Sequence, residues 1–448
     1  MASQRNKDFN VVVLDIGSAC SKAGFSGEDA PSIVLPTVYD ESSTSTGSGV
    51  RKQRYMQESC EEYLDAENTN LAISNVVAGM GGHSASNDRP ISRGVVKDWD
   101  LMQKYCDVLL GELGISESDG ASIMLVENPL TVQGTRIQWA ECFFANSYYN
   151  APALCFGNSS SMCIFSSGRT TGVAVELGAG ITSSVPVFEG LALKHAAITV
   201  DKGGQDVTTR LRKLMSDRGI KINYEDTRIL KENMTYVDTC AYGFNNSRVE
   251  KTTLSLPDGN EVEIENKLFS DCNNVFFQYN LASNYPTGLV HQVGESISLC
   301  DDYLRRELSS HIILAGGCSM TAGLGDRLGA ELGERLNANA NANASTNATA
   351  PNANAIATAS TSLPATGVLK SAGGGLANTI RNNLNGFIFD IRVFPSTSHR
   401  ESGYTNQRRF APWVGGSIFG SLETFNDLKL TRQEWEESGE RLLLTKCY

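Results

Sequence analysis

Two glycine-rich turns combine small and charged residues in a pattern suited to holding a phosphate. The first lies in LDIGSACSKAGF (14–25) and the second in VELGAGITSSVP (175–186), and each follows a short apolar run and leads into another. A turn of this kind between two strands lets backbone N–H groups approach an anion, because glycine has no Cβ to block the way. Either turn alone is equally well explained as an ordinary β-hairpin.

A third glycine-rich turn strengthens the phosphate interpretation. LAGGCSMTAG (314–323) leaves an apolar run and enters a segment with helical spacing. The start of a helix favours a phosphate or ribose, because its unpaired N–H groups and the helix dipole attract negative charge. Three such turns in this order favour a nucleotide site over three unrelated turns.

The elements that must position these turns alternate between strand and helix patterns. Short apolar runs predict strands at 11–16, 122–126, 172–177, 183–188 and 311–314, and apolar residues at helical spacing predict helices at 99–113, 207–215, 227–237 and 295–308. Elements of these lengths in this order favour an α/β protein. A chain of 448 residues has room for one large two-lobed fold or about three average domains.

Two stretches depart in composition from this compact body. Residues 42–87 are rich in Ser, Thr and Gly, and we expect a variable surface insertion there. Residues 337–385 open with a tract of Asn, Ala, Ser and Thr that carries no charge. Such a tract buries too little apolar surface to offset the entropy lost on ordering, so the sequence predicts a disordered loop.

Composition and charge exclude several classes of protein. A formal net charge of −12 argues against a surface that coats nucleic acid, because neutralising phosphates needs clustered Lys and Arg. We find neither a secretory signal pattern nor an uninterrupted apolar stretch of membrane-spanning length, and we expect a soluble intracellular protein without a membrane partner. The five histidines are scattered, so a metal held by imidazole is not expected.

At this point the motifs resemble a known family, the actin-related proteins. DIGSACSKAGFSGEDAP resembles the family's first phosphate loop, SGRTTGVAVELGAG the second, LAGGCSMTAG the adenosine motif, and PWVGGSIFGSLETF with EWEESGERLLLTKCY the C-terminus. The resemblance implies an α/β actin fold, in which two ribonuclease-H-like domains close on a cleft that holds ATP or ADP with Mg²⁺. It places the first lobe at 1–166 and 398–448, with the variable insertion at 39–93. The second lobe would cover 167–397, with a helical subdomain at about 203–291 and the insertion at 337–385.

The resemblance carries over the nucleotide-binding positions residue by residue. Asp15 stands where the family has the carboxylate that holds the cation through water, Ser18 where a hydroxyl meets a terminal phosphate, and Lys22 where a lysine bridges phosphates. The other matching positions are Gly17, Glu176, Gly178 and Gly180 in the two loops, Arg228, Lys231 and Glu232 on a helix beside the base and ribose, Gly316 and Gly317 on the adenosine turn, and Arg409 near the adenine. For each residue alone, an ordinary solvated side chain is an equally good explanation.

The positions that orient the attacking water in the family are altered here. Ser159 replaces a glutamine, Ser183 replaces a histidine, Glu176 replaces a shorter carboxylate and Ala179 replaces a second aspartate. Phosphoryl transfer depends on positioning, and two short hydroxyls cannot reach where a glutamine and an imidazole did. We therefore expect nucleotide binding with little or no hydrolysis, a degenerate ATPase in which ATP clamps the lobes.

Within the family, the altered positions and the RGVVKDWD segment most resemble the nuclear subfamily called actin-related protein four. That resemblance implies a nuclear scaffold subunit of a chromatin-remodelling or histone-acetyltransferase complex. It also makes actin itself a candidate partner. Two alternatives stay open at the level of sequence. One is a divergent cytoskeletal or dynactin-type protein that forms filaments with ATP turnover, and the other is a small-molecule kinase on the same fold.

The resemblance also implies a groove that captures an amphipathic helix of a partner protein. The matching positions are Phe165, Gly168, Phe419, Leu422 and Leu428. Apolar residues there could receive anchors spaced at i, i+4 and i+7. The competing explanation is that they are core or rim residues near the C-terminus. We expect no direct, specific binding of nucleic acid.

Overall fold

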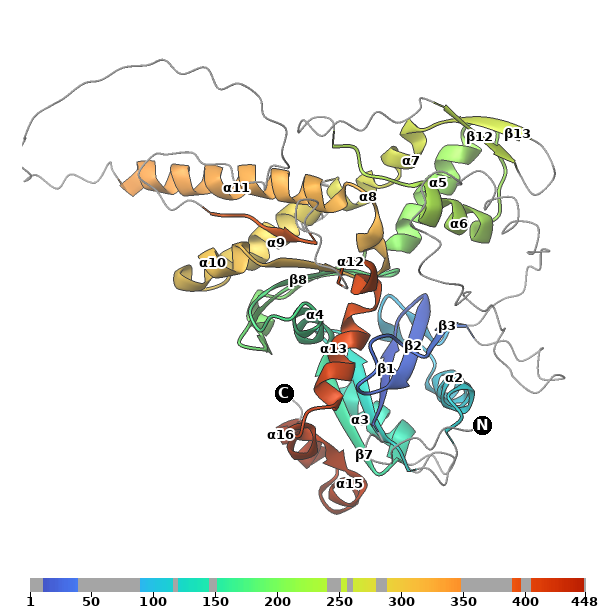
Figure 1. The fold of residues 1–448 in the computed structure, drawn as a ribbon, viewed down its shortest axis with the longest axis vertical. Coiled ribbons are helices and arrows are strands. Elements are labelled where there is room, and N and C mark those ends of the chain that lie inside the picture. The colour runs from blue at the N-terminus through green and yellow to red at the C-terminus, as the bar shows by residue number, and fades with distance from the viewer. Residues whose placement is uncertain are drawn as a thin grey trace, which may run out of the picture.

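The computed structural model describes residues 11–38, 89–115, 120–144, 151–239, 251–255, 261–278, 288–347, 389–395 and 404–446. Two mixed sheets organise these residues. The first runs in the order β16-β7-β6-β1-β2-β3 and the second in the order β10-β9-β8-β14-β15, with β11 (Ile198–Val200) paired to β9. Figure 1 shows the two sheets on either side of a central pair of helices. The α/β class and the two-lobed arrangement predicted from the sequence are confirmed.

Each sheet is built around an antiparallel hairpin followed by a parallel strand. In the first sheet β1 (Val11–Ile16) pairs antiparallel with β2 (Cys20–Phe25) and parallel with β6 (Ser122–Glu127). In the second sheet β8 (Gly172–Leu177) pairs antiparallel with β9 (Thr182–Phe188) and parallel with β14 (Ile312–Ala315). The two lobes therefore repeat one plan, and the two phosphate-loop candidates occupy the same position in it. The remaining strands of these sheets are β3 (Ile33–Pro36), β7 (Ala153–Asn158), β10 (Leu191–Ala192), β15 (Val393–Phe394) and β16 (Leu430–Thr431).

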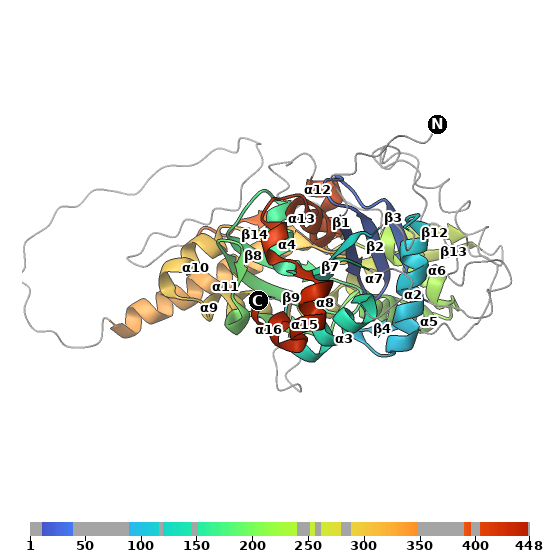
Figure 2. The ribbon, with the colours of Figure 1, turned by 90° about the horizontal axis from the view of Figure 1, so that it is seen from below.

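Helices α4 (Ser159–Ser166) and α13 (Ala411–Gly420) lie between the two sheets (Figures 1 and 2). Their backbones approach so closely that a Cβ on Gly415 would overlap the backbone of Met162. Trp413, fully buried, donates its indole N–H to the carbonyl of Val13 at 3.0 Å. Helix α13 is thereby fixed against the first hairpin.

Each lobe has its own apolar core. The first lobe packs α2 (Trp99–Glu112) and α3 (Gln133–Phe144) on its sheet, and α2 begins where the Asp98 side chain accepts from the N–H of Leu101 at 2.9 Å. The second lobe packs α9 (Leu289–Ser298), α10 (Asp302–Ser309) and α11 (Leu324–Asn347) on its sheet. A smaller helical part contains α5 (Gly204–Ser216), α6 (Tyr224–Met234), α7 (Lys267–Asp271) and α8 (Asn274–Phe277), with the hairpin β12 (Lys251–Ser255) and β13 (Glu261–Glu265). None of the helices in the described part of the chain is both long and apolar enough to cross a membrane.

Several predicted elements end a few residues from their bounds in the structure, the helix predicted at 227–237 being α6 (Tyr224–Met234), and two predictions differ by more. The single helix predicted at 295–308 is broken into α9 and α10, because Asp301 has an extended backbone and Arg305 donates to the carbonyls of Ser298 and Cys300 that end α9. Helix α11 continues to Asn347, into the tract predicted as a disordered loop. Extending a helix that already exists costs less than starting one, and alanine favours it. The rest of that tract, 348–385, lies outside the described residues.

Candidate functional site

The first hairpin brings together two of the predicted phosphate-site residues. Asp15 on β1 faces Lys22 on β2 in register, and Lys22 Nζ lies 2.9 Å from Asp15 Oδ2. Both side chains are nearly buried, with 14% and 13% of their surface exposed. Burial acts to lower the pKa of Lys22, but the Asp15 carboxylate outweighs it and the pKa is raised above its usual value. Lys22 is therefore a permanent cation at the end of the hairpin.

The turn of the first hairpin faces the turn of the second. Ser18 Oγ accepts a hydrogen bond from the backbone N–H of Gly94 at 2.9 Å. A Cβ placed on Gly180 would lie 3.1 Å from that hydroxyl and 2.9 Å from the Cα of Arg93. A side chain at Gly180 would clash with both of these groups, so the glycine allows the two turns to approach one another closely.

The second hairpin places its carboxylate against hydroxyls. Glu176 on β8 faces Ser183 on β9 in register, and both belong to a largely buried sheet. Glu176 Oε1 accepts from Ser159 Oγ at 3.0 Å and from Ser160 Oγ at 2.5 Å, both at the start of α4. Burial raises the pKa of Glu176, and the two hydroxyl bonds only partly oppose this. The sequence interpretation found Ser159 but missed Ser160, although three consecutive serines at the start of a helix were visible.

These contacts limit what the altered positions can do. A serine hydroxyl has one hydrogen, and Ser159 gives it to Glu176, so it cannot also donate to a water. The described carboxylates, thiols and imidazoles form no group of three or more that could hold a metal ion by themselves. A cation near Asp15 would therefore need water or phosphate oxygens as its other ligands.

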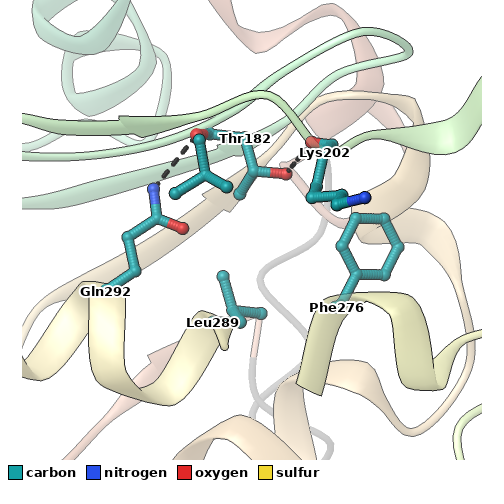
Figure 3. Close-up of a pocket in the computed structure, with 6 residues that line it drawn as sticks. Thr182, Lys202, Phe276, Leu289 and Gln292 are labelled. Atoms are coloured by element: carbon teal, nitrogen blue, oxygen red, sulfur yellow. Dashed lines mark hydrogen bonds between the residues drawn. The ribbon is translucent and has the colours of Figure 1, made fainter. Parts of the chain in front are cut away.

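A shallow pocket beside this hairpin is lined by Thr182, Val200, Lys202, Phe276, Leu289 and Gln292 (Figure 3). Gln292 Nε2 donates to the carbonyls of Thr182 at 3.0 Å and Ile198 at 2.9 Å, and Thr182 Oγ1 donates to the carbonyl of Lys202 at 2.8 Å. These polar groups are bonded to one another. They fix β9, the strand that carries Ser183, against β11 and α9.

The predicted adenosine side comes together around Gly178. Gly316 ends β14 with a φ of 85°, and a Cβ there would meet the carbonyl of Leu177 at 2.6 Å. The Cys318 thiol, in the turn η5 (Gly317–Met320), lies 3.5 Å from the carbonyl of Gly178. Lys231 Nζ donates to the carbonyl of Gly204 at 3.3 Å, at the start of α5. A Cβ on Gly317 would meet nothing within 4 Å, so the turn is open on that side.

Three other predicted residues have different immediate partners. Arg228 binds Glu225 and Glu232 on its own helix, each at 2.9 Å. Arg409 stacks its guanidinium 4.7 Å from the centre of the Phe410 ring. Its neighbour Arg408, which the sequence interpretation missed, contacts the adenosine turn: its Nη2 donates to the carbonyl of Ser319 at 3.2 Å and its own carbonyl accepts from Gly316 N at 3.0 Å.

The predicted groove residues divide into buried and exposed members. Phe165 and Phe419 are half-buried and pack against the cluster around Trp413. Phe165 also lies against Gly190, and Gly168 ends its helix with a φ of 72°. Leu422 and Leu428 are 49% and 42% exposed, and the neighbouring Ile418, which the sequence interpretation did not include, is 43% exposed. Apolar side chains therefore reach the surface at the end of α13.

One functional candidate lay hidden in the stretch 39–93 that the sequence assigned to a variable insertion. Residues 39–88 are outside the described residues, but Arg93 contacts the second phosphate-loop candidate: its Nη1 donates to the carbonyl of Gly180 at 2.7 Å, and its guanidinium pairs with Asp206. The only sequence signal was its place in RGVVKDWD.

Comparison with known proteins agrees with this geometry. A family model described as Actin matches residues 6–361 and 389–448, which is nearly the whole chain. Proteins of that family generally bind ATP or ADP with a divalent cation. Because the match covers nearly the whole chain, the chain belongs to the actin family.

Proposed function

We propose that this protein binds ATP with Mg²⁺ as a structural ligand and hydrolyses it very slowly or not at all. The residues present fit such a ligand. Lys22 is a cation held at the end of the first hairpin, Asp15 is a carboxylate at the same turn, and Gly180 lets the second turn approach the first closely. ATP would supply negative charge that Lys22 and the backbone N–H groups neutralise, and Asp15 would hold the cation's water.

The observation that carries the proposal of slow hydrolysis is the bonding of Glu176. Ser159 and Ser160 both give their hydroxyl hydrogens to one oxygen of this carboxylate. The groups that would have to orient a water are therefore occupied with each other. A ligand that binds the folded state without being consumed stabilises it by mass action.

We further propose that the protein is a nuclear scaffold subunit of a chromatin-remodelling or histone-acetyltransferase complex, which docks an amphipathic helix of a partner beside α13. Exposed leucines at 422 and 428, next to half-buried aromatic rings, support a docking surface of that kind. The alternative is a filament-forming cytoskeletal protein with ATP turnover.

Phosphate release decides between a structural and a catalytic nucleotide. We expect the purified protein to bind ATP and to release phosphate far more slowly than conventional actin does. Replacing Ser159 by Gln and Ser183 by His together should not restore full activity, since Glu176 and Ala179 also differ. Release at the rate of conventional actin, abolished by Asp15→Ala, would refute the proposal. Filaments that sediment in Mg²⁺ and salt would favour the alternative.

Leu422→Asp tests the docking surface. A charge there would be buried without a counter-ion once the partner helix binds, which costs on the order of 2 kcal/mol or more. In the free protein the side chain is half exposed, so folding and ATP binding should be unchanged. Affinity purification from cells, read by mass spectrometry, should recover the wild type with remodeller subunits and the variant without them. Equal recovery would rule out this surface.

A further inference from the structure

Residues 89–94 are bonded to the first lobe at the turn of its hairpin. Arg89 Nη1 donates to the carbonyl of Ser18 at 3.2 Å, and the N–H of Gly94 donates to Ser18 Oγ at 2.9 Å. The carbonyl of Gly94 accepts from Asn128 Nδ2, after β6, at 2.8 Å. Three hydrogen bonds therefore hold this segment to the first lobe.

The same segment reaches the second lobe through one side chain. Arg93 forms a two-pronged pair with Asp206, with Nη1 2.7 Å from Oδ2 and Nη2 3.0 Å from Oδ1. Nη1 also donates to the carbonyls of Gly180 at 2.7 Å and Asp201 at 3.1 Å. A planar guanidinium that meets a carboxylate with two parallel bonds makes one of the stronger and more directional polar contacts.

The acceptor carboxylate, Asp206, is also held by the backbone of its own helix. Asp206 lies in the first turn of α5 and its Oδ2 accepts from the N–H of Gly203 at 2.9 Å. Burial acts to raise the pKa of Asp206, but the bonds from Arg93 and from Gly203 bring the pKa below its usual value. The carboxylate is therefore ionised and already oriented.

The backbone of Arg93 has a conformation that a free chain would avoid. Its φ is 51°, in the left-handed region that residues other than glycine, asparagine and aspartate seldom adopt. Such a conformation persists only where surrounding contacts hold it. Here the hairpin of β4 (Ile91–Ser92) and β5 (Val95–Val96) holds it, because Arg93 and Gly94, with a φ of 72°, are the two residues of its tight turn.

We propose that Arg93 and Asp206 form a latch that holds the two lobes together across the mouth of the cleft and sets how fast a bound nucleotide leaves. Arg93 belongs to the segment that is bonded to Ser18, and its side chain binds Asp206 and the carbonyl of Gly180 on the other lobe. Opening the cleft between the two lobes must therefore break the pair of Arg93 and Asp206. The link to nucleotide release depends on the ATP binding proposed above, whereas the closure of the lobes does not.

Arg93→Asn is the sharpest variant, because asparagine tolerates the left-handed backbone but cannot reach Asp206. The matched control is Arg305→Asn. Arg305 is as exposed as Arg93, 34% against 35%, and it also pairs with one aspartate and donates to two carbonyls, but all of its partners lie within the second lobe. Asp206→Asn removes the charge from the other side of the latch while an amide oxygen can still accept from Gly203.

The readout is the dissociation rate of a fluorescent ATP analogue with Mg²⁺. We expect Arg93→Asn to raise it about fivefold, as for a partly exposed, well-oriented ion pair, and Arg305→Asn to leave it unchanged. The double variant of Arg93→Asn with Asp206→Asn should be no faster than the faster single variant, because one interaction cannot be lost twice. Equal rates for Arg93→Asn and Arg305→Asn, or fully additive effects, would overturn the latch.

Hydrogen exchange in the nucleotide-free protein separates this proposal from the proposal of ATP binding. Amides at 17–20 and 178–181 should exchange faster in Arg93→Asn than in wild type, and the same amides should be unaffected by Arg305→Asn. If the analogue binds none of the proteins, ATP binding fails, and the exchange result alone still decides the latch. Unchanged exchange at both turns would refute it.

Discussion

The two hairpins of this protein place a carboxylate at the same position but set different side chains opposite it. Asp15 and Glu176 are each the fifth residue of a six-residue strand, and each faces a residue of the following antiparallel strand. Across from Asp15 is Lys22, and across from Glu176 is Ser183. The backbone plan is shared, so the difference in chemistry comes from the side chain opposite.

The consequence is a difference in charge. The first hairpin holds an ion pair in which the pKa of Lys22 is raised, so a cation faces the cleft at neutral pH. The second hairpin holds a buried carboxyl whose pKa is raised because burial outweighs two serine hydroxyls. One lobe thus presents a cation suited to binding phosphate, and the other a buried carboxyl bonded to two serines. The nucleotide binding proposed above rests on the first hairpin and the proposed slow hydrolysis on the second.

The largest effect should come from breaking the first hairpin. Lys22→Met leaves the nearly buried Asp15 without its cation, and removing one partner of a buried ion pair costs about 3 kcal/mol of unfolding free energy. ATP binding should be lost as well. Denaturant unfolding followed by fluorescence measures the first effect and an ATP thermal shift the second.

Lys251→Met is the control for that variant. Lys251 pairs with Glu263 at 3.4 Å, but both side chains are more than 60% exposed. Breaking such an exposed pair should lower the unfolding free energy by at most about 1 kcal/mol. If Lys22→Met lowered the unfolding free energy no more than Lys251→Met does, Lys22 would not be neutralising a buried carboxylate. The proposed difference between the two hairpins would then be wrong.

A smaller effect, of opposite sign, should follow from Glu176→Gln in the nucleotide-free protein. The pKa of Glu176 in the folded state is raised above the ordinary value of 4.5, so the folded protein binds this proton more tightly than the unfolded chain. Stability therefore falls as pH rises from the unfolded pKa through the folded one. Glutamine removes that loss and still accepts from the two serines. At pH 7 the variant should be more stable than wild type by more than the ~0.5 kcal/mol typical of surface changes.

The pH dependence and a second buried glutamate make this prediction specific. The gain from Glu176→Gln should vanish at pH 4, where the carboxyl is protonated in both states. Burial also raises the pKa of Glu127, but Glu127→Gln should instead destabilise the protein at pH 7, because it removes the negative charge from a buried pair in which Arg136 Nε donates to Glu127 at 2.9 Å. A loss of stability on Glu176→Gln at pH 7 would show that Glu176 is ionised and well solvated by its neighbours.

The sequence predicted the fold better than the site, for identifiable reasons. Strands 11–16 and 172–177 were placed residue for residue, because a buried strand is a continuous apolar run that ends at glycine. Helix breaks were harder. The gap between α9 and α10 depends on Arg305 reaching back to two carbonyls, a contact that no pattern of hydrophobicity reveals.

Contacts between distant segments account for what the sequence missed in the site. Arg93 and Asp206 are 113 residues apart, and Ser160 and Glu176 come from different elements. Arg93 also followed a stretch whose composition suggested a variable surface insertion. Residue types and spacing identified the loops, since a phosphate loop is local, but they could not identify partners that only the closed arrangement of two lobes brings together.

The smallest effect should be that of Ser160→Ala, which tests whether the serines control the charge on Glu176. The hydroxyl hydrogen bond at 2.5 Å favours the ionised carboxylate, so its loss should raise the pKa of Glu176 further and cost about 1 kcal/mol at pH 7. The cost should shrink at pH 4, where a protonated carboxyl no longer needs the donor. In the background of Glu176→Gln it should also shrink, because a neutral amide oxygen is a weaker acceptor than a carboxylate.

Ser161→Ala provides the comparison on the same helical turn, since the described donors to Glu176 are Ser159 and Ser160. The Ser161 backbone N–H, which donates to Asn158 Oδ1 at 3.4 Å, is kept in that variant. The data come from thermal unfolding, at pH 4 and pH 7, of wild type, Ser160→Ala, Ser161→Ala, Glu176→Gln and the double variant of Ser160→Ala with Glu176→Gln. If Ser160→Ala and Ser161→Ala behaved alike at both pH values, the serine cluster would be serving the start of α4 alone. The charge on Glu176 would then be set by burial, and Ser160 would play no part in the slow hydrolysis proposed above.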